Sequence, residues 1–478
     1  MDRDDSSATT RDRVLKPLED SGLKRFHFRT WITAGMGFFT DAYDLFIIGV
    51  VTTLLLPLWH LTTLNLMILN STALFAAVLG ALVFGRLMDR LGRKTVYGVE
   101  AILLTAGALL SAFAPNFWLL VLFRFIVGLG VGGDYPMSGV IMSEYSNRSR
   151  RGFLVNAVFA MQGFGLLVGP AVAAILLASG VPAEISWRLM LGLGAIPAGL
   201  VIYLRRRIAE TPHFALGVRG DVTEAAAIVE RLTDTPVAER GQVAKLPGSW
   251  KILFTNRRYL VTLLGTAISW MMLDMAFYGN SVSSGLVLKA LSPTGTLLSH
   301  TLTSALIFLV AAVPGYWVAA FTVDRLGRRF IQVMGFLVMA LAYGAIWLIP
   351  TLTAVPLAFL LVYAVSYFFI EFGPNSTTFI YPSEVFPVTV RGWGFGISAS
   401  AGKLGAAVAA FLFPVLLVQL KIAGTMGLLA GISALGLAVT LLTLGEPKGQ
   451  TLREASHESL LEGTPAPSAR TKQVGLGR

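Results

Sequence analysis

The stretch GRLMDRLGRK at residues 85–94 occurs a second time as DRLGRR at residues 324–329. Each copy follows a long apolar segment and precedes another. A second motif, Ser-Glu followed by Arg-Gly, lies within residues 143–152 and again within residues 383–392, so both motifs recur at an offset of about 240 residues. Two unrelated motifs repeated at nearly one spacing predict an internal duplication, and hence a chain built from two similar halves.

Twelve apolar segments surround these motifs. They lie approximately at residues 31–56, 67–86, 96–113, 118–141, 154–178, 189–204, 259–282, 300–321, 331–349, 355–380, 393–418 and 424–444. Each is about long enough for a helix to cross a hydrocarbon layer of about 30 Å. Hydrophobic residues make up 55% of the chain and charged residues only 14%, whereas soluble proteins have about 25% charged residues. We therefore predict an all-α polytopic membrane protein with 12 transmembrane helices in two pseudo-symmetric six-helix bundles.

The net charge of +11 follows the predicted topology. Lysines and arginines gather in the tails, in the two repeated loops and in the central loop, while the loops of the other side hold few. Basic residues concentrate on the cytoplasmic side of membrane proteins. We therefore expect both termini in the cytoplasm and no nucleic-acid partner. Cysteine is absent, which excludes disulfides and thiolate metal sites.

These boundaries predict five parts: a cytoplasmic tail 1–30 without the apolar core of a signal peptide, a bundle 31–204, a cytoplasmic central loop 205–258, a bundle 259–444 and a disordered cytoplasmic tail 445–478. We expect neither tail to contribute to a site. Within the loop, residues 221–232 (DVTEAAAIVERL) have helical spacing. This helix either lies on the membrane surface or is a solvated linker.

Ionisable side chains inside the apolar segments are the candidate functional residues, because burying them in a membrane is costly. Asp41 and Asp44 are three residues apart on one helix face, where close carboxylates resist simultaneous ionisation. Trp270, Asp274 and Tyr278 form a single helical stripe. The other candidates in these segments are Glu100, Arg124, Asp134, Tyr135, Gln162, Glu371, Asn375 and Lys403.

Three of these residues prompt specific expectations. Arg124 is placed to neutralise a carboxylate on a neighbouring helix. Glu100 either relays protons or extends to the membrane interface. Lys403 is alone among small apolar residues and needs a counter-ion or an anionic ligand. Next to Asn375, the pair Gly373-Pro374 interrupts the helix and frees backbone groups to face a cavity.

The repeated loops resemble those of the major facilitator superfamily over residues 30–450, and residues 210–212 (ETP) and 446–449 (EPKG) resemble its sugar-porter branch. We expect the charged groups of these loops to latch the halves on the cytoplasmic side. The gate residues are Asp89, Arg90, Arg93, Glu144, Arg151, Asp324, Arg325, Arg328, Glu384 and Arg391.

Four blocks are similar to the phosphate:proton symporter family: residues 35–46, 132–136, 372–379 and 396–403. The resemblance implies that phosphate is held by Tyr135, Gln162, Trp270, Asp274, Tyr278 and Asn375. It associates Asp41, Asp44 and Asp134 with proton movement and Lys403 with charge balance, and we add Glu100 and Glu371 to the proton-coupling candidates and Arg124 to charge balance. The family usually has Asn where this chain has Glu371.

The resulting hypothesis is a proton-coupled symporter that imports inorganic phosphate by alternating access, in the plasma or inner membrane, as a monomer. Its partners are a small solute, protons and the lipid bilayer; it needs no cofactor or metal, since the proton gradient supplies the energy. The alternative is a proton-coupled carrier of sugars or of aromatic and other organic acids, favoured by Glu371. An enzyme is not expected, because no nucleotide-binding loop, metal-ligand spacing or nucleophile–base pair stands out.

Overall fold

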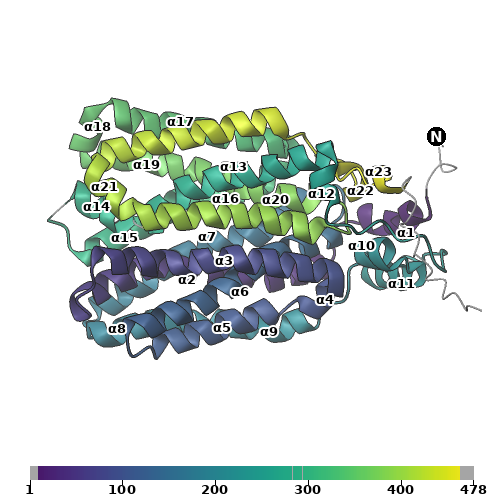
Figure 1. Cartoon of the computed structure of the whole chain (residues 1–478), viewed down its shortest axis with the longest axis horizontal. Coiled ribbons are helices and arrows are strands. Elements are labelled where there is room, and N and C mark those ends of the chain that lie inside the picture. The colour runs from purple at the N-terminus through teal and green to yellow at the C-terminus, as the bar shows by residue number, and fades with distance from the viewer. Residues whose placement is uncertain (1–8, 283, 293, 463–478) are drawn as a thin grey trace, which may run out of the picture.

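The computed structural model describes residues 9–282, 284–292 and 294–462. Long helices running side by side form the body of the molecule, and short helices gather at one end (Figure 1). We call this the polar end. It contains α1 (Thr10–Glu19), α10 (Pro212–Phe214), α11 (Val222–Thr233), α12 (Ile252–Thr255), α22 (Leu452–Ala455) and α23 (Ser459–Glu462).

The first half contributes six long helical segments. They are α2 (Arg25–Leu58), α3 (Thr63–Leu91), α4 (Arg93–Val96) with α5 (Val99–Ala112), α6 (Phe117–Tyr145), α7 (Arg151–Ala178), and α8 (Ala183–Leu193) with α9 (Ala195–Arg206). Polar caps set their starts: the Thr62 and Asn65 side chains form a capping box at α3, and Asn116 accepts a hydrogen bond from the Leu119 amide at α6.

The second half repeats this plan. Its helices are α13 (Arg257–Val282), α14 (Ser284–Leu291), α15 (Leu297–Ile307), the π-helix η2 (Phe308–Ala312), α16 (Val313–Leu326), α17 (Arg328–Leu348), α18 (Pro350–Ala354), α19 (Pro356–Ile370), the π-helix η3 (Glu371–Asn375), α20 (Ser376–Val385) and α21 (Arg391–Thr443).

Two glycines show that the duplication extends to backbone geometry. Gly92 has φ 98° and ψ 155°, and Gly327 in the matching loop has φ 94° and ψ 155°. Both values lie in a region that residues with a Cβ rarely adopt. A Cβ at either position would also approach a glutamate, Glu210 or Glu446, within 2.4 Å. The repeated loops therefore need glycine at the same step of the turn.

Eleven helical segments of the described chain are long and apolar enough to cross a membrane. The last of them, α21, has 53 residues and would be about 80 Å long if straight. At Lys421 its backbone leaves the helical region, with φ 56° and ψ −177°, and the two parts are separate helices joined by a kink. Two predicted segments, 393–418 and 424–444, lie on either side of this kink.

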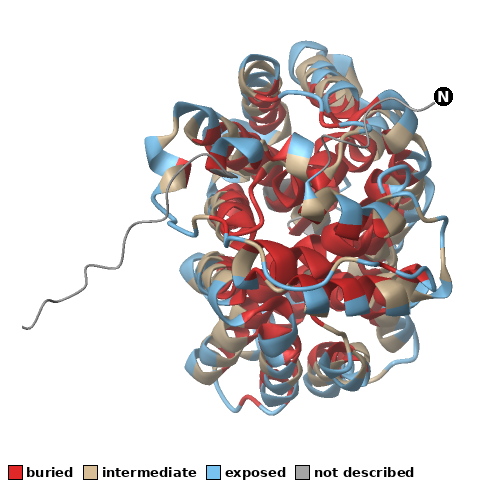
Figure 2. Cartoon of the chain, turned by 90° about the vertical axis from the view of Figure 1, so that its right-hand side faces the viewer, coloured by how far each residue is buried: buried red, intermediate tan, exposed pale blue. Residues whose placement is uncertain are grey.

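The helices of each half pack on one another, and the halves meet along their length (Figures 1 and 2). Within the first half α2 packs on α7 and α3 on α6; within the second half α13 and α17 pack on α21. Between the halves, α3 contacts α21, and α7 contacts α15, α16 and α20. Seen from the polar end, buried residues fill the middle and exposed residues the outside (Figure 2).

The outer surface of the bundle is apolar. Exposed large apolar side chains occur on helices of both halves, for example Leu79, Leu200, Phe321, Leu361 and Leu442. Extensive exposed apolar surface marks a site of interaction, such as contact with a membrane. Such an exterior around a polar centre is typical of a multi-pass membrane protein, as the composition predicts.

The polar end differs from the predicted tails and loop. The apolar face of α11 packs on α1, with Val14, Leu15, Leu18, Ala225 and Val229 in their shared core. The predicted loop helix is therefore present, but its apolar side is covered by the N-terminal segment. Residues 445–462 are also structured where disorder is predicted, because their polar groups bond to the bundle. The rest of that tail, residues 463–478, lies outside the described residues.

Candidate functional site

The middle of the molecule holds an ion pair between α13 and α21. Lys403 donates from Nζ to Asp274 Oδ2 at 3.1 Å and to the Tyr278 hydroxyl at 2.9 Å. The same ammonium lies 4.3 Å from the ring centroids of both Tyr135 and Tyr278, a cation–π arrangement. Asp274 is fully buried, and its Oδ1 has no hydrogen-bond partner in the described chain. This oxygen is therefore an acceptor available to a ligand.

The predicted stripe on α13 is present, and it faces this ion pair. Trp270, Asp274 and Tyr278 are all at most 1% exposed. The indole of Trp270 lies against Gly402, where a Cβ would come within 2.5 Å of the ring. Glycine at this position therefore lets α13 and α21 approach closely beside Lys403.

Hydrogen bonds at the centre join the two halves directly. The hydroxyls of Tyr135 and Tyr278 are 3.3 Å apart, and Gln162 Nε2 donates to the Tyr135 oxygen at 3.2 Å. The Tyr316 hydroxyl donates to Gln162 Oε1 at 2.7 Å. Tyr135 and Gln162 belong to the first half, on α6 and α7, whereas Tyr278 and Tyr316 belong to the second. We call the two hydrogen bonds that join the halves, Tyr135 to Tyr278 and Tyr316 to Gln162, the crossing bonds.

The helix interruption predicted in the tenth segment lies next to this network. Gly373 has non-helical φ −93° and ψ −116° within η3, in contact with Gly335 of α17. Asn375 Nδ2 donates to the Tyr316 hydroxyl at 2.7 Å and to Glu371 Oε2. The π-turn therefore brings Glu371 and Asn375 to the same side as Tyr316.

Aromatic rings surround this network and help to bury it. Phe38 packs edge-on against Tyr135 with centroids 5.0 Å apart, and Phe159 stacks on Phe379 at 4.5 Å. Phe395 contacts Trp270 at 5.7 Å. Because these groups are buried, each charge or hydrogen bond among them contributes more than it would at a surface.

A second polar cluster lies within the first half. Arg205 of α9 donates to Glu100 Oε1 at 2.8 Å and to Asp134 Oδ2 at 2.9 Å, and all three side chains are at most 2% exposed. The Ser138 hydroxyl donates to Asp134 Oδ1 at 2.5 Å. A Cβ at Gly37 would lie 1.9 Å from both Arg205 and Asp134. Glycine on α2 therefore makes room for this ion pair.

Asp41 and Asp44 occupy different surroundings despite sharing a helix. Asp44 pairs with Arg124, with Oδ1 3.4 Å from Nη1, and its carbonyl oxygen accepts from Nη2 at 3.0 Å. Neither carboxyl oxygen of Asp41 has a hydrogen-bond partner in the described residues, and the side chain is fully buried. The position expected for Arg124 is thus found, and the two aspartates do not form a mutually bonded pair.

The structure brings most of the predicted site residues together. Six lie in the central network with Lys403 and Glu371: Tyr135, Gln162, Trp270, Asp274, Tyr278 and Asn375. Asp134 and Glu100 instead belong to the Arg205 cluster, so Glu100 does not extend to the membrane interface. Sequence reasoning missed Tyr316 and Arg205. The predicted boundary places Arg205 in the central loop, which is wrong because α9 continues to Arg206.

The predicted gate residues meet at the polar end in two matching clusters. In one, Glu144 accepts from Arg93 at 2.9 Å and, across the halves, from Arg391 at 2.8 Å. In the other, Glu384 accepts from Arg328 at 2.8 Å. All five side chains are at most 3% exposed.

Two aspartates connect each half to a helix start of the other. Asp89 accepts from the amides of Gly392 and Trp393, at 3.0 and 2.7 Å, at the start of α21. Asp324 accepts from the amides of Gly152 and Phe153, at 2.9 and 2.8 Å, at the start of α7. A carboxylate at a helix N-terminus satisfies free amides and meets the positive end of the helix dipole. These contacts join the two halves at the polar end.

The clusters differ from the prediction in some members. Arg90 and Arg325 have exposed side chains without an ion pair in the described chain. Arg151 donates to the Gln450 carbonyl at 3.0 Å, and Glu458, a predicted tail residue, lies 3.5 Å from Arg391 and accepts from the Val388 amide. The C-terminal segment therefore adds contacts to these clusters.

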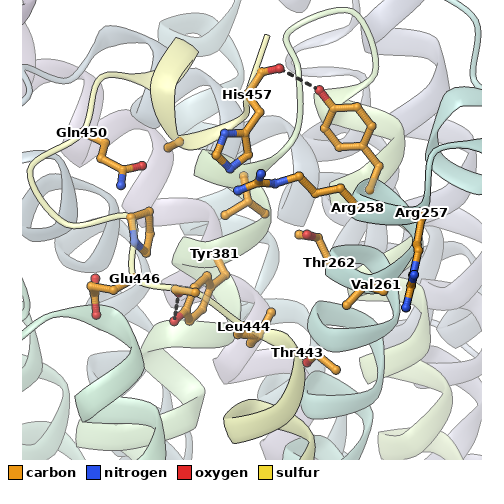
Figure 3. A pocket seen from close by; sticks show the side chains of 15 residues that line it. Arg257, Arg258, Val261, Thr262, Tyr381, Thr443, Leu444, Glu446, Gln450 and His457 are labelled. Carbon is orange, nitrogen blue, oxygen red and sulfur yellow. Dashed lines mark hydrogen bonds between the residues drawn. The ribbon is translucent and has the colours of Figure 1, made fainter. Parts of the chain in front are cut away.

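A separate cavity of about 650 Å³ opens at the polar end, between the start of α13 and residues 443–457 (Figure 3). Arg258 and His457 point into the same part of it, and the Tyr381 hydroxyl bonds to the Gly445 carbonyl at its wall. It shares no residue with the central network. Within the described residues, no group of His, Asp and Glu is arranged to hold a metal ion.

Comparison with known proteins agrees with this architecture. A family model described as "Sugar (and other) transporter" matches residues 30–458. The chain is 36% identical to "Inorganic phosphate transporter 1-2" of Oryza sativa subsp. japonica, over 94% of this chain and 97% of that protein. It is 34% identical to "Probable inorganic phosphate transporter 1-6" of Arabidopsis thaliana, over 93% and 96%.

Among solved structures, the proton:xylose symporter XylE bound to 6-bromo-6-deoxy-D-glucose aligns with a TM-score of 0.78 at 20% identity, covering 91% of this chain and 99% of that chain. A partially occluded inward-open conformation of XylE from E. coli aligns with a TM-score of 0.72 at 20% identity, over 90% and 100%. This likeness shows the fold of the major facilitator superfamily.

Proposed function

This chain belongs to the sugar (and other) transporter family, and we propose that it imports inorganic phosphate together with protons by alternating access. The observation that carries the proposal is whole-length similarity to proteins named inorganic phosphate transporters. The central network is compatible with that cargo, because it offers one buried cation and several hydroxyl and amide donors at the contact between the halves. Fold alone would leave the cargo open.

Twelve crossings and a cytoplasmic position of both termini are part of the proposal. The kink at Lys421 divides α21 into a pair of spans, which turns eleven candidate helices into twelve. The basic loops of both halves lie at the polar end, so that end faces the cytoplasm. The proposed parts are the tail 1–30, the bundles 31–204 and 259–444 with the loop 205–258 between them, and the tail 445–478, in a monomer of the cell membrane.

In this proposal the anion displaces the crossing bonds and lies beside Lys403. Donors on Tyr135, Gln162, Trp270 and Tyr278 bond its oxygens, while Lys403 offsets its charge in surroundings of low dielectric constant. The free Oδ1 of Asp274 accepts a hydrogen bond from a P–OH group. Sulfate has no proton at neutral pH, and it would leave this carboxylate facing bare oxygens. Such an unpaired group gives strong discrimination.

Proton coupling in the first half falls to Asp41. Arg205 is the counter-ion of Asp134 and Glu100, and Arg124 that of Asp44, whereas Asp41 has no hydrogen-bond partner in the described chain. A buried carboxyl in such surroundings is neutral at lower energetic cost than ionised. Protonation from outside and release inside then couple its charge state to rocking of the halves about the centre. The proton gradient is the only energy source required.

Uptake into proteoliposomes tests the proposal. Purified protein is reconstituted, an inward proton gradient is imposed, and labelled phosphate uptake is measured with and without a protonophore. We expect gradient-dependent uptake that excess arsenate competes and sulfate does not, and a loss of at least tenfold in Asp274→Asn. The matched control is Glu184→Gln, the same kind of change at an exposed carboxylate whose one ion pair in the described chain is with Arg188.

The alternative carrier of sugars or organic acids predicts a different outcome. Labelled xylose or benzoate would then be taken up, and unlabelled phosphate would not reduce that uptake. Phosphate uptake that persists unchanged in Asp274→Asn, or after the proton gradient is collapsed, would rule out the mechanism proposed above.

A further inference from the structure

Glu371 is a buried carboxyl at the edge of the central network. It is the first residue of η3, between α19 and the interruption at Gly373, and its side chain is fully buried. Oε2 accepts from Asn375 Nδ2, and Oε1 has no hydrogen-bond partner in the described chain. The carboxyl therefore points into the polar centre with one oxygen uncommitted.

Among the described residues, no cation offsets a charge on Glu371. Its titratable neighbours are Tyr316 on α16, Tyr367 on α19 and Asp274 on α13, of which the last is a like charge. α17 presents Gly335 to this turn. The ammonium of Lys403 is taken by Asp274 and Tyr278. An ionised carboxylate in such surroundings is strongly disfavoured, and the neutral acid, with its hydroxyl hydrogen, is the form that fits.

A chain of hydrogen bonds links Glu371 to the central network. Asn375 uses its two amide hydrogens on Glu371 and Tyr316, and Tyr316 continues the chain to Gln162 and so to Tyr135. With its donors occupied, Asn375 has its carbonyl oxygen left for a ligand. Nearby, the O–H of a protonated Glu371 is a further hydrogen-bond donor. An amide at position 371 would also offer a donor, its N–H, but it could not bind and release a transported proton.

On the basis of the proposed function, we propose that Glu371 binds one of the transported protons and, as a neutral acid, donates a hydrogen bond to a phosphate oxygen. The proton enters with the anion from outside and leaves the carboxyl when the site opens to the inside. The wild-type chain then moves one proton more per phosphate than a variant with an amide at this position.

The limiting phosphate gradient measures this difference. Proteoliposomes are given a pH difference of one unit, the membrane potential is clamped at zero, and phosphate is allowed to accumulate until net flux stops. Each coupled proton multiplies the limiting ratio of inside to outside phosphate about tenfold, because one pH unit is a tenfold difference in proton activity. We expect the ratio for Glu371→Gln and Glu371→Asn to fall about tenfold, and that for Glu184→Gln to match wild type.

A slower rate alone leaves this ratio unchanged, so a purely structural role for Glu371 would not reproduce the result. Equal ratios for wild type and Glu371→Gln would overturn the inference and leave the proposed function intact. Absence of phosphate accumulation by wild type would instead overturn the proposed function.

Calorimetry covers the case in which the amide variants do not fold. Phosphate binding to wild type and Glu371→Asp is measured in two buffers of different ionisation enthalpy, which counts protons taken up per phosphate bound. Above neutral pH we expect both proteins, which keep a carboxyl, to take up a proton on binding. Proton uptake that is absent from wild type, or absent from Glu371→Asp while phosphate still binds, would contradict the assignment.

Discussion

Replacing Arg205 by Gln tests the buried cluster of the first half most directly. The change removes two charge-assisted hydrogen bonds, of 2.8 Å to Glu100 and 2.9 Å to Asp134, from side chains that are at most 2% exposed. Glu100 keeps the Gly98 amide and Asp134 keeps the Ser138 hydroxyl, but both carboxylates lose their cation. Breaking a buried pair by removing one partner costs about 3–5 kcal/mol, so we expect a loss of that size in the free energy of unfolding.

Denaturant unfolding in detergent, followed by tryptophan fluorescence, measures this loss. Arg206→Gln is the matched control: the neighbouring arginine is exposed, and its replacement is expected to stay within about 0.5 kcal/mol of wild type. The double variant Arg205→Gln/Asp134→Asn removes one orphaned carboxylate and should recover part of the stability, a coupling that a double-mutant cycle quantifies. A cost below about 1 kcal/mol for Arg205→Gln, or no recovery in the double variant, would refute this account.

Two further expectations concern the polar end. Asp89→Asn removes a charge and one acceptor from the start of α21, worth about 1–2 kcal/mol, so the population of the open state of this end should rise roughly 5–30-fold. Because the chain lacks cysteine, the rate of maleimide labelling of a Ser143→Cys variant measures this population. Asp324→Asn should act alike, and unchanged labelling would contradict the latch. Burial raises the pKa of Glu19 to about 7, against the attraction of nearby arginines. The folded state therefore binds this proton more tightly, and stability falls as pH rises from about 4.5 to about 7. In melting curves Glu19→Gln should gain on wild type across that window while Asp20→Asn, at an exposed carboxylate, should not; parallel pH profiles for wild type and Glu19→Gln would exclude the effect.

The sequence predicts the helices and the centre well where periodicity carries the information. Trp270, Asp274 and Tyr278 are four residues apart, so their common face follows from helix geometry alone. The duplicated loops predict the two halves, because their turns need glycine at Gly92 and Gly327 in the same conformation. A lone arginine in an apolar segment also predicts a carboxylate partner on a neighbouring helix, and the partner of Arg124 is Asp44.

The sequence does not predict which side chains of different helices contact one another. Arg205 lies at the end of a span, where arginines usually only mark topology, and its local sequence does not indicate that it reaches Asp134. Tyr316 occurs in an apolar segment, where a tyrosine alone is a weak signal, yet it bonds to both Gln162 and Asn375. The role of Glu458 depends on a tail that folds back, which composition cannot indicate because its contacts are with distant loops.

The crossing bonds affect the return step of the transport cycle, in which the protein carries no phosphate. Since Tyr135 bonds to Tyr278 and Gln162 to Tyr316, these hydroxyl and amide groups can stay paired with one another while the unloaded protein returns. A carrier that returns readily without cargo favours net uptake over the exchange of internal for external phosphate. Labelled phosphate held inside should consequently exit no faster when unlabelled phosphate is added outside.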